Sequence, residues 1–578
     1  MIEENGKYSR KECEYLRSSL SNEFYTFRED WIDHLYWVNP ARAKYMLGRE
    51  GGRRDNYHIV DPSHIMSHRS FVAGFMEGNT SSTRSWFKFA HPDKDLNKFL
   101  PVKQYMQNLN ERCLAIATSS NLYHALAEAY ADYGIVNTAC MYIDEYDKGP
   151  HFTVLPAGTY YLMNNNMGVA DTLVREFPMT IKNIVETFGK KVNGKWDWSN
   201  FSETVKNSYE SGNYTTTMII CEVVKQNHLF TNDLPEAGSN RKWVSLVYES
   251  LGYDCTTPYG GPVDTRSSGG YDDDKFLRVS HKTRKPFISF RTQSSNNFAY
   301  GETGPTTNAL GLIKSLNKKA ISKDLALDLM LAPPMQGPAN LKKSYVNANP
   351  RGYTALDPHT ASLGGAKPLF QISNGIGALI QDVNDLRSMV GKMYYEDFML
   401  FLSRNPKTRT AAEVNAIMSE QQLVIGPALQ SLDFTLNNPL VDYLADYAIF
   451  EDAYIGDPPE ELEGTSLRTV FISVFAQAQR AADLPSIDRY IQGMLNVSQM
   501  SNDPSLLDKV DFDKFADLYE DRLYLPAGLN RPQSDVDARR EKNQKDAQRQ
   551  QMLTESLPAI AGAAKDLAGT ADLELPQV

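Results

Sequence analysis

The sequence has few cysteines and no long apolar run. Its five cysteines lie far apart without a CxxC pair, which argues against both a zinc module and a disulfide framework and favours a reducing compartment. No stretch of about 18 apolar residues occurs, and the polar start MIEENGKYSRKE lacks the apolar segment of a signal peptide. We therefore expect a soluble protein that is made in the cytoplasm and has no membrane partner.

Positive charge is also scarce. The 60 Lys and Arg residues are outnumbered by 71 Asp and Glu residues, and the formal net charge is -11. A protein that embraces nucleic acid over its whole surface is typically basic. Any contact with DNA is therefore expected to be local or weak.

The motifs of several enzyme classes are missing. The sequence contains no GxxxxGK[ST] loop, so it is not expected to hydrolyse a nucleotide, and it contains no HExxH motif. The basic, glycine-rich stretch 48–55 does not follow a predicted strand as a phosphate-binding loop should, and is interpreted as an exposed loop. These absences favour a protein that is not an enzyme and needs no cofactor.

Two groups of side chains leave a metal site open as an alternative. His64 and His68 are four residues apart on a predicted helix, but no acidic or cysteine partner is near in sequence, so a core or surface role is favoured. Two carboxylate groups could hold Mg²⁺ in a nuclease, although turn-like acidic segments are more often solvated loops. They are Asp272, Asp273 and Asp274, and Asp144, Glu145 and Asp147.

The chain has enough apolar side chains to form large hydrophobic cores. Of its 578 residues, 42% are hydrophobic and 11% are aromatic. The first 135 or so residues predict helices, because apolar residues recur at steps of three and four. From Ala139, short β-branched and aromatic stretches predict a mixed sheet. One helix interrupts it, from a cap at Thr180 to a stop at Gly189. The predicted fold class is α+β, mainly helical.

Two amphipathic helices follow Tyr300. The first carries apolar residues from Leu310 to Leu329 on one face and ends at Pro333, and the second carries a stripe from Ile376 to Tyr394. The Pro- and Gly-rich insert between them predicts a long antiparallel hairpin with a knob at its tip. Because each stripe would be half exposed in isolation, we expect it to pack against neighbouring copies as well. Four cations occupy the rest of the first helix: Lys314, Lys318, Lys319 and Lys323.

The segment after the hairpin combines an apolar run, FMLFL, with the cations Arg404, Lys407 and Arg409. A capping box of Thr410 and Glu413 opens the next helix. Pro427 lies inside it and is expected to bend it. A strand, LRTVFIS, a helical array and an exposed, charged helix from about residue 531 complete the chain.

Several stretches, in this order and spacing, resemble the portal, or head-to-tail connecting, proteins of podoviruses over nearly the full length. They include SFVAGFMEGNTSSTRSWFKF (70–89), SSNLYHALAEAYADYGIVNTACMYID (119–144), GVADTLVREFPMTIKNIVETFG (168–189) and YGETGPTTNAL (300–310). LAPP (331–334), KTRTAAEV (407–414) with the following IGPALQ, and ISVFAQAQR (472–480) continue the match. Each is modest alone, and together they are specific.

The resemblance implies a portal fold, a dodecameric ring with wing, stem, clip and crown regions around a central channel. Carried over to this chain, it implies eight regions in order: wing with helices and mixed β-sheet (1–304), stem helix 1 (305–331), clip (332–375), stem helix 2 (376–397), tunnel loop (398–410), kinked helix and wing return (411–465), crown (466–530), and C-terminal helical extension or barrel (531–578).

The same resemblance implies a structural protein at the unique capsid vertex, through which double-stranded DNA is packaged and ejected. Implied partners are the terminase large subunit, tail adaptor or nozzle proteins, major capsid and scaffolding proteins and internal core proteins. The candidate DNA-channel residues are the tunnel-loop cations and the four stem lysines. The candidate clip residues for docking are Lys342, Lys343, Tyr345, Arg351, Tyr353 and Lys367.

Three alternatives stand beside these assignments. The cations could be solvated charges or could form interface salt bridges worth about 0–1 kcal/mol each. The clip residues could form an ordinary polar loop. The whole chain could instead be a metal-dependent DNA-processing enzyme, or another internal virion structural protein.

Overall fold

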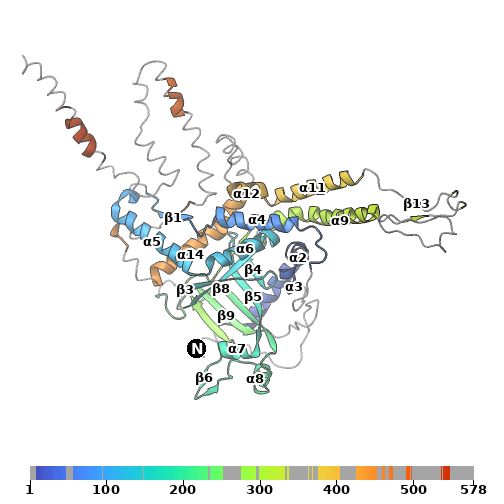
Figure 1. Ribbon diagram of the computed structural model, residues 1–578. Helices are drawn as coiled ribbons and strands as arrows, with labels where there is room; N and C mark the ends of the chain where they lie inside the picture. Colours follow the sequence, from blue (N-terminus) through green and yellow to red (C-terminus); the bar gives the residue numbers. More distant parts are fainter. Residues whose placement is uncertain are drawn as a thin grey trace, which may run out of the picture. The chain divides into compact units, whose positions relative to one another are not determined.

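The computed structural model (Figure 1) forms two compact units, Met1–Ala482 and Asp483–Val578. The described residues are 8–46, 56–93, 96–146, 149–231, 235–250, 275–294, 298–331, 335–336, 359, 362, 367–368, 375–403, 425–451, 458–462, 468–472, 490–494, 496–497, 536, 538–546 and 548. Helices and separate sheets alternate in the first unit, which confirms the predicted α+β class.

In the described part of the chain, five helices and one short 3-10 turn precede the first long strand. They are α2 (Arg10–Val38), α3 (Pro40–Met46), α4 (Ser63–Gly78), the turn Leu96–Lys98, α5 (Leu100–Ser119) and α6 (Leu122–Val136). The residues that predicted α5 face the core, since Val102, Leu109 and Cys113 are fully buried. The helix breaks between α5 and α6 at Ser120 and Asn121. The helical prediction for this region is confirmed.

The strands form two main sheets instead of one mixed sheet. The five-stranded sheet has the order β10 (Arg278–Lys282), β9 (Trp243–Glu249), β8 (Thr217–Gln226), β5 (Ala170–Thr180) and β4 (Tyr160–Asn164). The three-stranded sheet has the order β11 (Phe287–Arg291), β2 (Thr138–Tyr146) and β3 (Gly149–Val154). All pairings among the described strands are antiparallel, which corrects the expected mixed sheet. The reason lies in the connections, because turns as short as the one between β2 and β3 cannot join parallel neighbours.

A small lobe follows β5 and has its own core. Helix α7 (Ile181–Phe188) begins at Thr180, whose hydroxyl accepts a hydrogen bond from the Asn183 backbone, and it ends at Gly189, as predicted. The lobe continues with the hairpin of β6 (Lys191–Val192) and β7 (Lys195–Trp196) and with α8 (Glu203–Glu210). The core of this lobe includes the buried side chains of Ile181, Ile184 and Val205.

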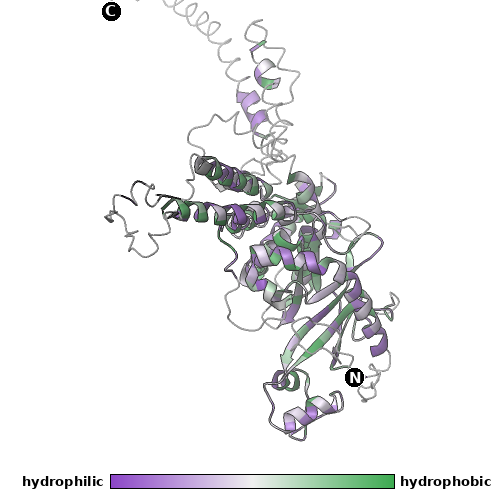
Figure 2. Ribbon diagram, turned by 90° about the vertical axis from the view of Figure 1, so that its right-hand side faces the viewer, coloured by the Kyte–Doolittle hydropathy of each residue, from purple (hydrophilic) through white to green (hydrophobic). Residues whose placement is uncertain are grey.

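The predicted hairpin is present. Helices α9 (Pro305–Leu331) and α11 (Gly375–Met393) lie side by side (Figures 1 and 2), and Leu316, Val383 and Leu386 form a small core between them. The predicted stripes are buried only in part, because Ile380 and Leu325 are exposed. In the insert, β12 (Met335–Gln336) pairs with β13 (Lys367–Pro368).

The second stem helix ends earlier than predicted. It stops at Met393, and Tyr395 has a φ of 55°, in the left-handed region that an α-helix does not use. A new helix, α12 (Glu396–Ser403), follows. Two boundaries are thereby corrected: the stem helix does not run to residue 397, and 398–403 of the predicted tunnel loop are helical. The break needs one residue in the left-handed region, which apolar periodicity does not reveal.

A helix that includes Ile425 leads into a π-helical turn (Asp433–Asn437) and then into α14 (Asn438–Glu451). The predicted cap at Thr410 and the residues up to 424 lie outside the described residues, so the predicted bend at Pro427 stays a prediction. After the turn Glu460–Leu462, strand β14 (Arg468–Phe471) is present as predicted, and it pairs with β1 (Phe87–Ala90).

The second unit contributes short described pieces. Residues 490–494 are helical, and residues 538–546 form an exposed helix, as predicted for this charged segment. The crown boundary and the rest of the C-terminal extension stay predictions.

Candidate DNA-channel and docking residues

The four stem lysines differ in their surroundings. Lys314 pairs with Asp33 of α2. Lys319 pairs across the hairpin with Asp382 of α11 at 2.5 Å, and Lys323 lies 3.4 Å from the carboxylate of its neighbour, Asp324. Lys318 is exposed and forms no ion pair with another described residue. Of the four lysines, Lys318 is therefore the one whose charge is exposed and not paired with a described carboxylate.

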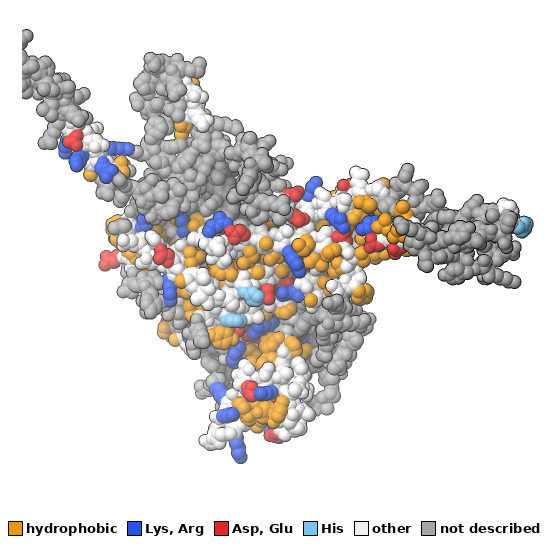
Figure 3. Space-filling model, in the orientation of Figure 1, with side chains coloured by type: hydrophobic (Ala, Val, Ile, Leu, Met, Phe, Trp, Pro, Cys, Tyr) orange, Lys and Arg blue, Asp and Glu red, His pale blue; other side chains and the backbone are white. Residues whose placement is uncertain are grey.

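The outer half of α9 has an apolar surface that the described residues leave uncovered. Figure 3 shows orange side chains gathered over the outer part of the α9–α11 pair. Leu331 is 85% exposed, and four other side chains of the same segment are exposed too: Ile321, Leu325, Leu327 and Met330. Ile380, near the start of α11, is also exposed. Exposed apolar side chains that gather on one surface are typical of a site of association.

The inner end of the hairpin, by contrast, is anchored by polar contacts to the first helices. Arg387 of α11 forms an ion pair with the buried Asp61 at 2.8 Å. The buried Asn317 side chain accepts hydrogen bonds from the backbone N–H groups of Val60 and Asp61. Burial alone would raise the pKa of Asp61, but hydrogen bonds from Ser63 and Arg387 bring it below its usual value.

A second anchor lies at the break between α11 and α12. The hydroxyl of Tyr394 is 2.7 Å from that of Thr306, which donates to the Gly134 carbonyl. Ser67 of α4 donates to the Glu396 carboxylate at 2.7 Å. The helix that leads toward the candidate tunnel loop is therefore tied to α4 and to the base of α9.

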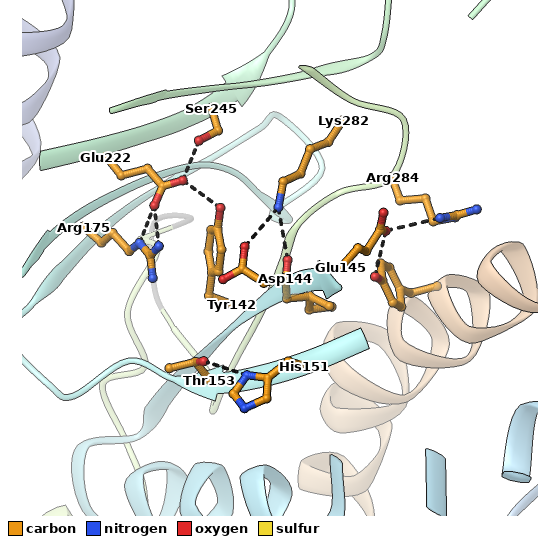
Figure 4. Close-up of polar contacts among 12 residues, drawn as sticks. Tyr142, Asp144, Glu145, His151, Thr153, Arg175, Glu222, Ser245, Lys282 and Arg284 are labelled. Carbon is orange, nitrogen blue, oxygen red and sulfur yellow. Dashed lines mark hydrogen bonds and ion pairs between the residues drawn. The ribbon is translucent and has the colours of Figure 1, made fainter. Parts of the chain in front are cut away.

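Two of the acidic residues that suggested a Mg²⁺ site, Asp144 and Glu145, are instead partners of cations (Figure 4). Lys282 lies 3.4 Å from Asp144, and Arg284 lies 3.2 Å from Glu145, which also accepts a hydrogen bond from Tyr443. Among the described residues no group of His, Cys, Asp or Glu is arranged to hold a metal ion. Asp147 and 272–274 lie outside the described residues.

His64 and His68 are core residues, as favoured from the sequence. Their Nε2 atoms contact the backbone carbonyls of Trp37 and Ala131 at 2.9 and 3.0 Å. Burial lowers the pKa of both, that of His68 to about 4. Their pairing with main-chain oxygens of two other helices explains the four-residue spacing without a metal.

A buried network was missed by the sequence reasoning. Glu222 accepts hydrogen bonds from Arg175, Ser245 and Tyr142, as the dashed lines in Figure 4 mark. The available signal was a charged residue inside the apolar run TMIICEVV, since charges are almost never fully buried unless paired. The three partners of Glu222 lie on three other strands, so no local sequence pattern could predict them.

Most other candidate residues lie in parts of the chain that the structure does not describe. The tunnel-loop cations Arg404, Lys407 and Arg409 lie outside the described residues. So do the clip residues Lys342, Lys343, Tyr345, Arg351 and Tyr353. Lys367 belongs to β13, in register with Gln336. Their roles stay predictions.

Two further features concern the cysteines and the apolar character of the helices. Cys13, Cys113, Cys140 and Cys221 are free and buried, and burial raises their pKa, that of Cys140 to about 12. No helix in the described ranges has the length and apolar character needed to cross a membrane.

Comparison with known proteins identifies relatives over almost the whole chain. The family described as bacteriophage head to tail connecting protein matches residues 10–257 and 267–529. The chain is 30% identical over 551 residues to the "Portal protein" of Salmonella phage epsilon15, covering 94% of this chain and 93% of that protein. It is 28% identical over 519 residues to the "Probable portal protein" of Bordetella phage BPP-1, covering 88% and 87%.

The match to a solved structure titled "Virion of native gene transfer agent (GTA) particle" covers 73% of this chain and 97% of the chain in that structure. Its TM-score is 0.28 at 10% identity, a likeness too weak to support an argument. The assignment therefore rests on sequence.

The family is a structural, non-enzymatic one, and membership in it implies an oligomeric ring in the phage neck, at the portal vertex of the virion. The resemblance to podovirus portal proteins is confirmed by both phage relatives. With a family match through residue 529 and a named relative covered almost end to end, this chain belongs to the bacteriophage head-to-tail connecting, or portal, proteins.

Proposed function

We propose that twelve copies of this chain form a closed ring at the unique capsid vertex, and that double-stranded DNA enters and leaves the head through its central channel. The exposed apolar outer half of α9 carries this proposal, because in a lone chain it would leave Leu325, Met330 and Leu331 in water. Cyclic packing covers such a surface on every copy at once.

The charge of the chain suits a channel through which DNA slides. A tight grip would be a defect in a conduit, and each phosphate neutralised by a cation adds about 0.9 to the slope of log affinity against log salt. The net charge of -11 per subunit repels DNA from the walls. Weak contacts then fall to Lys318 and to the tunnel-loop cations.

The clip is proposed to dock the terminase large subunit during packaging and the tail adaptor or nozzle proteins afterwards. Its candidate contacts are Lys342, Lys343, Tyr345, Arg351, Tyr353 and Lys367. Major capsid, scaffolding and internal core proteins would contact the ring elsewhere, during assembly in the host cytoplasm. A ring without residues 337–366 that still recruits the motor would contradict the docking role.

Electron-microscope images of the purified full-length chain test the ring directly. We expect closed rings with a central hole and a mass of twelve subunits by native mass spectrometry. A Leu325→Asp, Met330→Asp double variant should remain folded by circular dichroism but fail to close rings, because charge would enter the apolar contact. The control is Met167→Asp, which changes a 79% exposed methionine in the β4–β5 turn and should assemble normally. Only monomers at high concentration would contradict the proposal.

A further inference from the structure

A small pocket lies where three elements meet, away from the stem. Its described lining comes from β11 and the segment just before it, from the turn between β4 and β5, and from the π-helical turn with the start of α14. It includes Lys285, Arg291 and Thr435. The space inside is about 20 Å³. One water-sized group needs about 10–15 Å³ on this scale, so the pocket accepts a single small occupant.

Two positive charges line this pocket without a matching carboxylate. Lys285 Nζ donates to the Ala170 carbonyl, and Arg291 Nη2 donates to the Gly168 carbonyl at 3.3 Å. Neither cation forms an ion pair with a described acidic residue, although Asp171 acts on Lys285 from a greater distance. Burial lowers the pKa of both, that of Lys285 to about 8, so the lysine is still mainly charged at neutral pH.

One donor on a residue that lines the pocket has no acceptor among the described residues. It is Arg291 Nη1, which is buried and makes no hydrogen bond to them. Leaving such a donor unpaired costs about 1–3 kcal/mol, and more when the group is charged. A hydrogen-bond acceptor beside Arg291 Nη1 would satisfy this donor, and next to two cations an anion is the acceptor that gains most.

We propose that this pocket binds one small anion between Lys285 and Arg291, either a chloride ion or one oxygen of a phosphate group. The anion accepts from Arg291 Nη1 and offsets both charges. Ser431 donates to the Arg291 carbonyl at 3.1 Å, so the same arginine also joins β11 to the helix that leads into the π-helical turn. Occupancy therefore stabilises the junction of β11, the β4–β5 turn and that turn. The phosphate oxygen could come from free phosphate or from DNA, and the two sources are separable by experiment.

The test uses the full-length protein at constant ionic strength. Chloride-35 NMR line broadening measures bound chloride directly, and unfolding midpoints are recorded as chloride or inorganic phosphate replaces gluconate. We expect a saturable rise of the midpoint with either anion, as binding to the native state alone requires. Arg291→Gln should abolish the saturable part and the excess line broadening. Lys182→Gln, which removes an exposed cation on α7, should keep both.

Several outcomes decide the question. A rise that never saturates, equal in wild type and Arg291→Gln, means screening only and overturns the site. If Arg291→Gln does not fold, Arg291→Lys and Lys285→Met serve instead, and wild-type saturation in both also overturns it. When a short DNA duplex displaces the chloride, the phosphate source is DNA. When only inorganic phosphate displaces it, the ligand is a free ion. Ring formation is not needed for either result.

Discussion

Arg175 on β5 and Glu222 on β8 are register partners in the five-stranded sheet, and their side chains form a buried ion pair of 2.5 Å. Glu222 is fully buried and also accepts a hydrogen bond from the Tyr142 hydroxyl at 2.7 Å. Tyr142 belongs to the other sheet, so one carboxylate joins the two sheets. A charge so deeply buried is tolerated because its partners replace the lost water.

Replacing this carboxylate by Glu222→Gln should lower the free energy of unfolding by about 3–5 kcal/mol, because the Arg175 guanidinium is left buried without a counter-charge. Chemical denaturation measures the change. The matched control is Glu186→Gln, which removes an exposed partner of Lys182 at 3.9 Å and should cost less than about 1 kcal/mol. Equal losses in the two variants would contradict the structural role of the pair.

The pH dependence of stability should carry a signature of Asp132. Burial raises the pKa of Asp132 from 3.8 to about 7, although the Arg42 guanidinium lies 2.6 Å away and opposes the shift. An acid whose pKa is higher in the folded state stabilises the fold below its unfolded pKa, and this contribution is lost as pH rises through the folded value. The stability of wild type relative to Asp132→Asn should therefore fall between about pH 4 and pH 7. Denaturation at several pH values measures it, and a constant or rising difference would refute the assignment.

The hydroxyl of Tyr394 should contribute to the anchor at the base of the stem. Tyr394→Phe removes the 2.7 Å contact with Thr306 inside the core and should cost about 0.5–1.5 kcal/mol. The midpoint of thermal unfolding measures this loss of stability. Tyr25→Phe, at a side chain that is 64% exposed, is the control and should leave the midpoint unchanged. No difference between the two variants would count against the anchor.

The tunnel-loop cations should matter for DNA and not for assembly. Changing Arg404, Lys407 and Arg409 to Ala should leave rings intact in electron micrographs but reduce the DNA that is packaged or retained per particle. Each removed cation weakens contact with phosphate. The control removes three exposed cations of the α7 lobe: Lys182, Lys190 and Lys195. Normal packaging by the tunnel-loop variant would remove the assignment.

Local patterns were sufficient for many elements. The cap at Thr180 and the stop at Gly189 delimit α7, because both act on backbone groups within a few residues. The apolar stripe of α9 was readable because helical spacing brings residues three and four apart onto one face. The break at Tyr395 could not be predicted from the sequence, because a single residue with a positive φ leaves no periodic pattern.

The candidate site divides in the same way. The sequence identified the stem lysines and showed that cations are concentrated there, but it could not show that Lys314 faces Asp33 across 281 residues. The suspected metal ligands Asp144 and Glu145 became ion-pair partners only when β2 was brought beside Lys282 and Arg284.

The sequence by itself determined the α+β class, most helix and strand positions, the pairing of α9 with α11 and, through its ordered motifs, the portal family. Tertiary structure alone decided that the strands form two antiparallel sheets, that Glu222 joins them, and which half of α9 stays uncovered. The physical reason is the distance along the sequence over which each effect acts, because propensity, capping and periodicity involve residues only a few positions apart. Strand pairing, charge pairing and burial depend on groups that only the folded chain brings together.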